Sequence, residues 1–188
     1  MGAGLPQLLG KAGNAKSYAE RLFNYPEVGP LSDDDARKAL LEPVIVQNVN
    51  FTKEALNEII RVTEKYPYFI QEWGYQCWKI AKESPINIDD VKQASNEAIS
   101  RLDKNFFRVR FDRLTPKEKE YLRAMAELGQ GPHKSGDIAG LMGVNSQNVA
   151  PYRSSLIRKG MIYSPQFGLT DFTVPLFVGY MKRAMPFN

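Results

Sequence analysis

The side chains best suited to recognise a ligand lie in one stretch, residues 144–159. Gln147 and Asn148 carry amides that can read the edge of adenine, and Arg153 can read guanine. Ser154 can hold a phosphate oxygen through its hydroxyl. The chemistry that this set predicts is recognition of base edges, and it requires a helix that presents these residues on one side.

Two other stretches contain residues that occur in phosphate loops or metal sites, but their spacing and context do not match such sites. Between Gly4 and Gly10 lie five residues, and Ala12 follows Lys11. A phosphate loop needs four residues between its glycines, and then a lysine followed by a hydroxyl residue. The aspartates at 33–35 follow no buried strand, so we interpret them as the acidic first turn of a helix rather than a metal site.

The sequence contains few residues that could act as a nucleophile or bind a metal ion. Cys77 is the single cysteine and His133 the single histidine, which excludes an internal disulfide, a cysteine-based zinc site and most histidine-based metal chemistry. Cys77 lies among Trp73, Trp78 and Ile80 in a helical pattern, so we interpret it as a buried structural thiol and both tryptophans as core. His133 lies in a Gly-Pro loop, where a phosphate contact or solvent exposure fits better than base catalysis.

A capped helix begins the segment that would position the base-reading residues. Thr115 can cap the free N–H groups, Pro116 suits the first helical position, and Glu118 can close a capping box. The apolar residues that follow at helical spacing are Tyr121, Leu122, Met125 and Leu128. A stretch of glycine and proline, residues 129–132, ends this helix.

Two further helices and a hairpin complete the segment. The second helix starts after Ser135, and its apolar residues are Ile138, Leu141 and Met142. The third carries Val149 and Leu156, which must both face the core, and Pro151 belongs in its first turn. Residues 161–163 and 170–174 predict strands joined by a tight turn at 166–168. The order predicts a winged helix-turn-helix, three helices plus a β-hairpin wing, with the third helix in the major groove.

The side opposite Val149 and Leu156 defines a predicted DNA-binding surface. The predicted DNA-binding residues are Lys134, Ser135, Gln147, Asn148, Arg153, Ser154, Arg158, Lys159 and Gln166. Lys134, Arg158 and Lys159 are expected at phosphates, and the turn at 166–168 in the neighbouring groove. The alternative is a winged helix that contacts only proteins, because this face carries few charges.

The residues before 113 predict a small all-helical domain. Ser32, Thr52 and Asn87 would cap helices, and Pro43 would end the first of them. A further helix would run over 67–82, and residues 106–111 either continue the last helix or begin a linker. The predicted core, separate from that of the winged helix, contains Phe51, Leu56, Ile59, Ile60, Phe69, Ile70 and Trp73. Residues 1–31, with one short helix over 15–23, are too small and broken to have a core.

Charge is unevenly placed along the 188 residues. Up to Arg113 there are 16 basic and 16 acidic residues, whereas from Leu114 onward there are 9 basic and 5 acidic. The whole formal excess of +4 therefore lies in the winged-helix half, as expected of a modest footprint for a polyanion.

Several blocks together resemble the C-terminal part of AAA-type ATPases related to the origin-recognition and initiator ATPases. The blocks are GAGLPQL (2–8), AKSYAERLF (15–23), YPYFIQEWG (66–74), FDRLT (111–115) and LIRKGMIY (156–163). The first block resembles the segment after the first-sensor strand, the second the helix and arginine before the lid, and the third the lid helix at the second sensor. The last two blocks resemble parts of the winged helix. The resemblance covers essentially the whole sequence. It implies a helical lid and a C-terminal winged helix, which in that family follow a nucleotide-binding α/β core.

The sequence departs from that family in three respects. Its phosphate loop and acidic magnesium strand do not occur here. Lys65 stands where related lids often have glycine, and Tyr68 stands where initiator-type lids carry the second-sensor arginine. These departures argue against sensing of a γ-phosphate by the lid. The resemblance implies Arg21 as a candidate arginine finger toward a neighbouring subunit, the alternative being a helix-surface arginine.

The sequence thus predicts three parts: residues 1–31, a remnant of the ATPase core edge; 32–112, a lid-like domain; and 113–188, a winged helix. The expected function is double-stranded DNA binding by this lid and DNA-binding portion, the alternative being a protein–protein interaction or oligomerisation module of such an ATPase. We expect no enzyme activity from the chain itself. ATP and magnesium are expected only for a full-length parent.

The expected partners are double-stranded DNA and either the missing ATPase core or another subunit, and not a membrane. No apolar run approaches the roughly 18 residues of a membrane span, and the first residues are not a signal peptide. The expected location is therefore cytoplasmic.

Overall fold

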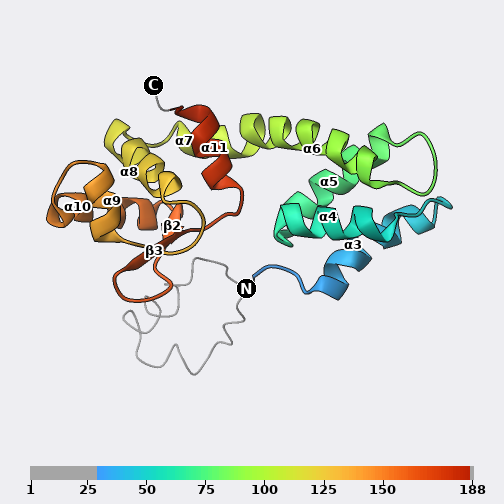
Figure 1. Ribbon diagram of the computed structural model, residues 1–188, viewed down its shortest axis with the longest axis horizontal. Helices are drawn as coiled ribbons and strands as arrows, with labels where there is room; N and C mark the ends of the chain where they lie inside the picture. Colours follow the sequence, from blue (N-terminus) through green and yellow to red (C-terminus); the bar gives the residue numbers. More distant parts are fainter. Residues whose placement is uncertain (1–28, 187–188) are drawn as a thin grey trace, which may run out of the picture. The chain divides into compact units, whose positions relative to one another are not determined.

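The computed structural model describes residues 29–186. The predicted helix over 15–23 and the other predictions for residues 1–28 lie outside the described residues. In the described part, a helical bundle is followed by a winged helix with a small antiparallel sheet (Figure 1). The predicted fold class, mainly α with a bundle and a winged helix-turn-helix, is confirmed.

The bundle contains the helices α3 (Asp33–Ile45), α4 (Lys53–Thr63), α5 (Pro67–Ile80) and α6 (Ile88–Leu102). Three of these helices begin at predicted caps, because the side chains of Ser32, Thr52 and Asn87 accept hydrogen bonds from backbone N–H groups of the first turn. Pro67 occupies the first turn of α5, where its missing N–H costs nothing.

One predicted helix end is wrong. Helix α3 continues through Pro43 to Ile45. Val44, the next residue, is buried in the bundle. Packing of Val44 in the last turn therefore keeps the chain helical where the local preference of proline would end it.

A π-helical turn, η1 (Asp103–Phe107), and the short helix α7 (Arg108–Phe111) continue α6 without a break (Figure 1). The Arg108 N–H donates to the Asp103 carbonyl, five residues earlier, which is the hydrogen bond of a π-turn. Of the two alternatives for this stretch, continuation of the helix is therefore observed.

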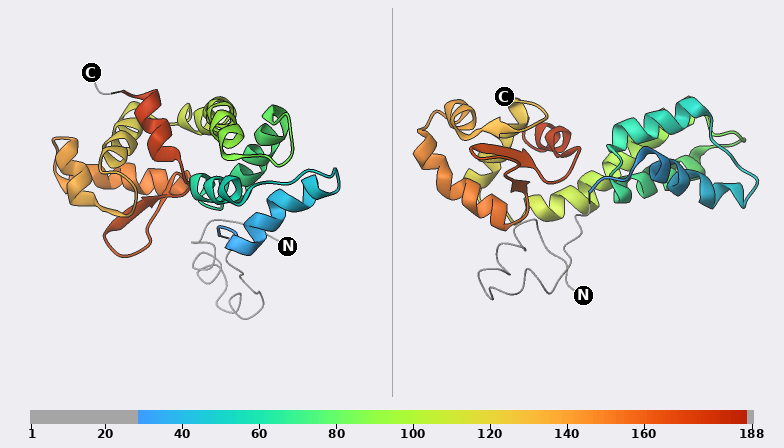
Figure 2. Two further views of the ribbon diagram at one scale, coloured as in Figure 1. Left: turned by 45° about the vertical axis from the view of Figure 1, so that its right-hand side comes forward. Right: turned by 90° about the horizontal axis from the view of Figure 1, so that it is seen from below.

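The winged helix contains the three predicted helices and two predicted strands in the predicted order, and one further short strand. They are α8 (Pro116–Glu127), β1 (His133–Lys134), α9 (Ser135–Leu141), α10 (Ser146–Arg158), β2 (Ile162–Tyr163) and β3 (Leu169–Phe172). Strand β3 lies between β1 and β2, and both pairings are antiparallel. The β2–β3 hairpin, or wing, extends from the three helices as a loop (Figures 1 and 2). Strand β1 was not predicted, because two residues are too few to show an alternating pattern.

A further helix, α11 (Phe177–Ala184), was not predicted and packs against α8. Phe177, Tyr180 and Met181 are its buried residues. The buried Arg123 of α8 donates from Nε to the Met185 carbonyl, 2.6 Å away, just after the end of α11. Helix α11 therefore completes the core of the winged helix.

The predicted core residues are mostly correct, but the prediction of two separate cores is wrong. Leu122, Met125, Ile138, Val149 and Leu156 are fully buried, as predicted. All buried apolar side chains of the described part belong to one connected cluster. The fully buried ring of Phe107 contacts Phe69 of the bundle and Phe177 and Tyr180 of α11, so it joins the two sides. The predicted boundary at 112/113 stays a prediction.

Two residues predicted to be in the core are exposed. Trp78 is 45% exposed, because the buried face of α5 is set by Trp73 and Cys77, and Trp78 lies one position beyond it. Leu141 is 51% exposed, because Ile138 and Ala139 define the buried side of the short helix α9. Each wrong prediction comes from assigning every apolar residue of a helix to its inner face.

Candidate nucleic-acid interface

Helix α10 presents a polar, exposed surface opposite its buried residues. Val149 and Leu156 face the core, which confirms the predicted phase of this helix. Gln147, Asn148 and Ser154 are exposed, so their side chains are free to meet a ligand. Pro151 lies inside the helix, one turn later than predicted, because α10 already begins at Ser146.

The structure gives Arg153 a different position from the predicted one. Its Nε donates to the Thr170 hydroxyl at 2.8 Å, and one terminal nitrogen donates to the Ser164 hydroxyl at 2.9 Å and the Leu169 carbonyl at 3.2 Å. The guanidinium therefore joins α10 to β3 and to Ser164, which directly follows β2. Its fork of donors suits this bridging role.

Lys159 also has a partner inside the protein. Its ammonium lies 2.7 Å from Glu118 Oε2 and donates to the Arg113 carbonyl at 3.2 Å. Glu118 also accepts from the Ser155 hydroxyl and the Thr115 N–H, each at 2.7 Å. Burial raises the pKa of Glu118, but the hydrogen bonds from Lys159, Thr115 and Ser155 lower it to about 2. The predicted capping box of Thr115 and Glu118 is confirmed, and Lys159 completes it.

The remaining predicted residues lie around the sheet and the ends of the helices. Lys134 is exposed in β1 opposite Leu169, and the half-buried Ser135 begins α9. Arg158 is exposed in the last turn of α10, and Gln166 is exposed in the wing.

His133, predicted in a loop, lies in β1. Its Nε2 is 3.1 Å from the Gly129 carbonyl. A ring nitrogen that donates to this carbonyl ties β1 to the end of α8, a structural contact that was not predicted.

Charge distinguishes this side of the winged helix. Residues 138–170, which span most of α9, all of α10 and the wing as far as Thr170, contain no aspartate or glutamate, and Asp137 and Asp171 flank this range. The exposed groups there include amides, hydroxyls and the cation of Arg158. A segment with exposed donors and a cation, and with carboxylates only at its two borders, suits a polyanionic partner.

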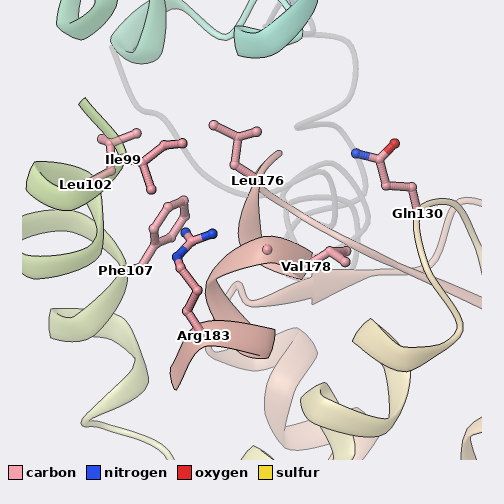
Figure 3. Close-up of a pocket in the computed structure, with 8 residues that line it drawn as sticks. Ile99, Leu102, Phe107, Gln130, Leu176, Val178 and Arg183 are labelled. Carbon is pink, nitrogen blue, oxygen red and sulfur yellow. The ribbon is translucent and has the colours of Figure 1, made fainter. Parts of the chain in front are cut away.

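A cavity of about 190 Å³ lies apart from this surface, between α6, η1 and α11 (Figure 3). Its walls are mostly apolar, and Leu102 and Phe107 contribute to them. Among the described residues that line it, the one charged group is Arg183, which forms a two-bond ion pair with Asp103 at 2.7 and 2.8 Å. This ion pair joins α11 to η1, so we interpret the cavity as part of a structural joint.

Metal binding, thiol chemistry and membrane insertion each need particular features of the described residues. No group of three or more His, Cys, Asp and Glu side chains is placed to hold a metal ion within residues 29–186. Cys77 is buried, as predicted, and burial raises the pKa of its thiol to about 12. In that same part of the chain, no helix is long and apolar enough to cross a bilayer. Arg21, the candidate arginine finger, lies outside the described residues.

Sequence reasoning missed Ser164 and Thr170, two residues that hold Arg153 in place. Both are hydrogen-bonded to Arg153, and Thr170 is fully buried. The sequence predicts the turn, because Ser, Pro and Gly at 164–168 favour tight turns. It does not predict which side chains bind Arg153.

Comparison with known proteins gives a family match over less than half of the chain. A family described as "Domain of unknown function (DUF8462)" matches residues 104–181. No curated protein matches the chain.

Among solved structures, a point mutant of Thermotoga maritima RuvB is 15% identical, with a TM-score of 0.44 over 92% of this chain and 55% of that one. The Thermotoga maritima RuvB Holliday junction branch migration motor is 15% identical, with a TM-score of 0.38 over 86% of this chain and 52% of that one. The chain thus spans about half the length of these structures. Similarities at these TM-scores do not bear on its function.

Proposed function

We propose that the winged helix binds double-stranded DNA, with α10 in the major groove and the wing in the neighbouring groove. The observation that carries this proposal is the set of exposed polar side chains on α10, in a segment, residues 138–170, that contains no aspartate or glutamate. Gln147 and Asn148, in the first turn of α10, would contact base edges, and Ser154 would follow one to two turns later.

Phosphate contacts are assigned to Lys134 and Arg158, whose side chains are exposed. Lys159 would have to leave Glu118 before it could reach a phosphate. Arg153 acts as a positioning residue, because its donors are used to hold the wing against α10. The proposed DNA contacts are therefore fewer than the DNA-binding residues predicted from sequence. They include only residues whose polar groups are exposed to a ligand.

We propose further that the chain is the lid and winged-helix region of an AAA-type ATPase related to the initiator ATPases, as the sequence blocks imply. Tyr68, at the second-sensor position, stacks on Phe106 with ring centroids 5.2 Å apart. The Tyr68 side chain itself offers no cation to a γ-phosphate, which supports a lid that does not sense this group through the second-sensor position. Coupling of DNA binding to nucleotide would then depend on other residues of the parent protein.

Removal of one phosphate contact is the first test. With a labelled duplex, Arg158→Ala and Lys134→Ala are each expected to weaken binding to all sequences about equally. Each is also expected to lower the slope of log affinity against log salt by about one unit, because one fewer counterion is released. By contrast, Gln147→Ala should cost about 1–3 kcal/mol at a preferred site only. Fluorescence anisotropy at several salt concentrations measures both quantities.

Lys53→Ala provides the matched control, because Lys53 is an exposed lysine at the start of α4, in the bundle. It should leave both affinity and salt slope unchanged. If wild type fails to bind duplex DNA even at low salt, or if Arg158→Ala and Lys134→Ala both behave like Lys53→Ala, the DNA-binding proposal is wrong.

The second candidate function is docking on a protein, which one observation favours. Tyr75 and Trp78 on α5 are 50% and 45% exposed, and Lys79 and Arg101 lie over the Tyr75 ring. Exposed aromatic residues of this kind are enriched in protein interfaces. Tyr75→Ala combined with Trp78→Ala should then reduce self-association or binding to the ATPase core with little salt dependence, as sedimentation would show.

A further inference from the structure

Phe167, at the tip of the wing, is the most exposed large apolar side chain in the part of the chain that the structure describes. Its relative exposure is 106%, whereas the other exposed large apolar residues range from 41% to 74%. Single exposed apolar residues are common, so exposure alone does not identify a site. The position of the ring and the hydrogen-bonded turn that carries it support the argument.

The turn that presents Phe167 is closed by its own hydrogen bonds. The Leu169 N–H donates to the Gln166 carbonyl at 3.1 Å, so Phe167 and Gly168 are the two central residues of the turn. Gly168 has a φ of +77°, which glycine adopts without strain. The Ser164 hydroxyl lies 2.9 Å from the carbonyls of both Gln166 and Leu169. The tip therefore has a defined conformation.

Helix α10 fixes the direction of this turn. Arg153 of α10 donates to the Ser164 hydroxyl and the Leu169 carbonyl, on either side of the tip. The backbone at Phe167 is thus held relative to the helix that carries Gln147 and Asn148. A turn whose backbone is already ordered loses less conformational entropy on binding.

The neighbours of Phe167 favour a nucleobase over a protein pocket. Ser164, Pro165, Gln166 and Gly168 surround it in sequence, all exposed and none charged. The anchors of protein interfaces cluster and are surrounded by further contacts. One planar ring on a small polar tip matches instead the face of a single base, whose stacking requires no other apolar contact.

We propose that Phe167 stacks on a nucleobase by entering the duplex at a base step that opens easily. This inference rests on the proposed DNA-binding function and adds a preferred substrate, duplex DNA with a mismatch or a flexible pyrimidine–purine step. Apolar side chains inserted from a groove partly unstack the neighbouring bases. The free energy needed is least where pairing or stacking is already weak.

The experiment compares two duplexes that carry 2-aminopurine at the same position and differ only at the centre, where one has a G·C pair and the other a mismatch. The full chain and its variants Phe167→Ala, Phe167→Trp and Val109→Ala are titrated by anisotropy and by 2-aminopurine fluorescence. Val109 is the matched control, an exposed apolar residue in α7. Circular dichroism confirms that each variant is folded.

Wild type should prefer the mismatched duplex and raise 2-aminopurine fluorescence on binding. Phe167→Ala should lose about 5- to 150-fold in affinity for the mismatched duplex, the range expected for one stacked base, and should not raise the fluorescence. Its salt slope should stay unchanged, because phenylalanine releases no counterion. Phe167→Trp should retain the preference, and Val109→Ala should match wild type.

Three results separate the two proposals. If wild type binds duplex DNA with the expected salt slope but Phe167→Ala binds both duplexes as wild type does, stacking is wrong and DNA binding stands. If Phe167→Ala lowers the affinity for both duplexes equally, the stacking proposal is also wrong, because such a result indicates a groove contact. If neither wild type nor any variant binds either duplex, the proposed DNA-binding function is wrong.

Discussion

Phe107→Ala should destabilise the fold by about 3–5 kcal/mol, the range for truncating a fully buried aromatic residue. The Phe107 ring contacts Phe69 and Phe106 on one side and Phe177 and Tyr180 on the other, at centroid distances from 5.1 to 5.9 Å. Its removal would leave a void where the bundle meets the winged helix. Because one connected cluster holds both parts, wild type should unfold in urea in a single transition.

In Phe107→Ala the two parts should lose this coupling, so the urea transition is expected to broaden or to split. Circular dichroism and tryptophan fluorescence, followed together, measure this effect, since both tryptophans lie in α5 of the bundle. Val109→Ala is the matched control, two residues along the same helix and exposed, and it should stay within about 0.5 kcal/mol of wild type. A loss below about 1 kcal/mol for Phe107→Ala would contradict the joint that we describe.

Glu118→Gln should have the second largest effect, a loss of about 2–3 kcal/mol at neutral pH. Glu118 is only 3% exposed and accepts hydrogen bonds from Lys159, Ser155 and Thr115. An amide has one acceptor oxygen, so its NH2 group would face a donor and leave that donor unsatisfied. Urea unfolding at neutral pH gives the magnitude. Glu120→Gln, at a more exposed ion pair on the same helix, should change stability by less than about 1 kcal/mol.

The same carboxylate predicts how stability depends on pH. Its pKa is about 2 in the folded chain and 4.5 ordinarily, so the folded state favours the charged form. This contribution to stability is therefore fully present above pH 4.5 and is lost as the pH falls toward 2. Comparison of unfolding free energies at about pH 7 and about pH 3 should show a smaller acid loss for Glu118→Gln than for wild type. Equal losses would mean that Glu118 is not held by these partners.

What could be predicted from sequence was local. The cap formed by Thr115 and Glu118 depends on residues three positions apart, and the phase of α10 depends on Val149 and Leu156, so both predictions were confirmed. The partner of Glu118, Lys159, lies 41 residues away and requires the fold to be known. For the same reason, Arg153 was predicted to read bases, although the structure directs it to Ser164 and Thr170 of the wing.

Helix α11 shows a different limit. Its N-cap, Leu176, has a φ of +65° and makes no side-chain hydrogen bond to the first turn. The usual start signal, a Ser, Thr, Asp or Asn at this position, is therefore missing. Burial of Phe177, Tyr180 and Met181 stabilises the helix instead, and burial depends on α8, which is remote in sequence.

The π-turn between Leu102 and Arg108 has a consequence for insertions and deletions. Leu102 and Phe107 are five positions apart and both are buried, whereas at about 100° per residue an α-helix would turn them about 140° apart. Loss of one residue here, such as the exposed Asn105, would leave them four positions apart, on nearly the same face of a regular α-helix. A relative one residue shorter between 103 and 107 can therefore keep both sides of the core in phase. A gap elsewhere in this run of helix would turn one side away from its partners, so an alignment of relatives should place a one-residue gap at this turn.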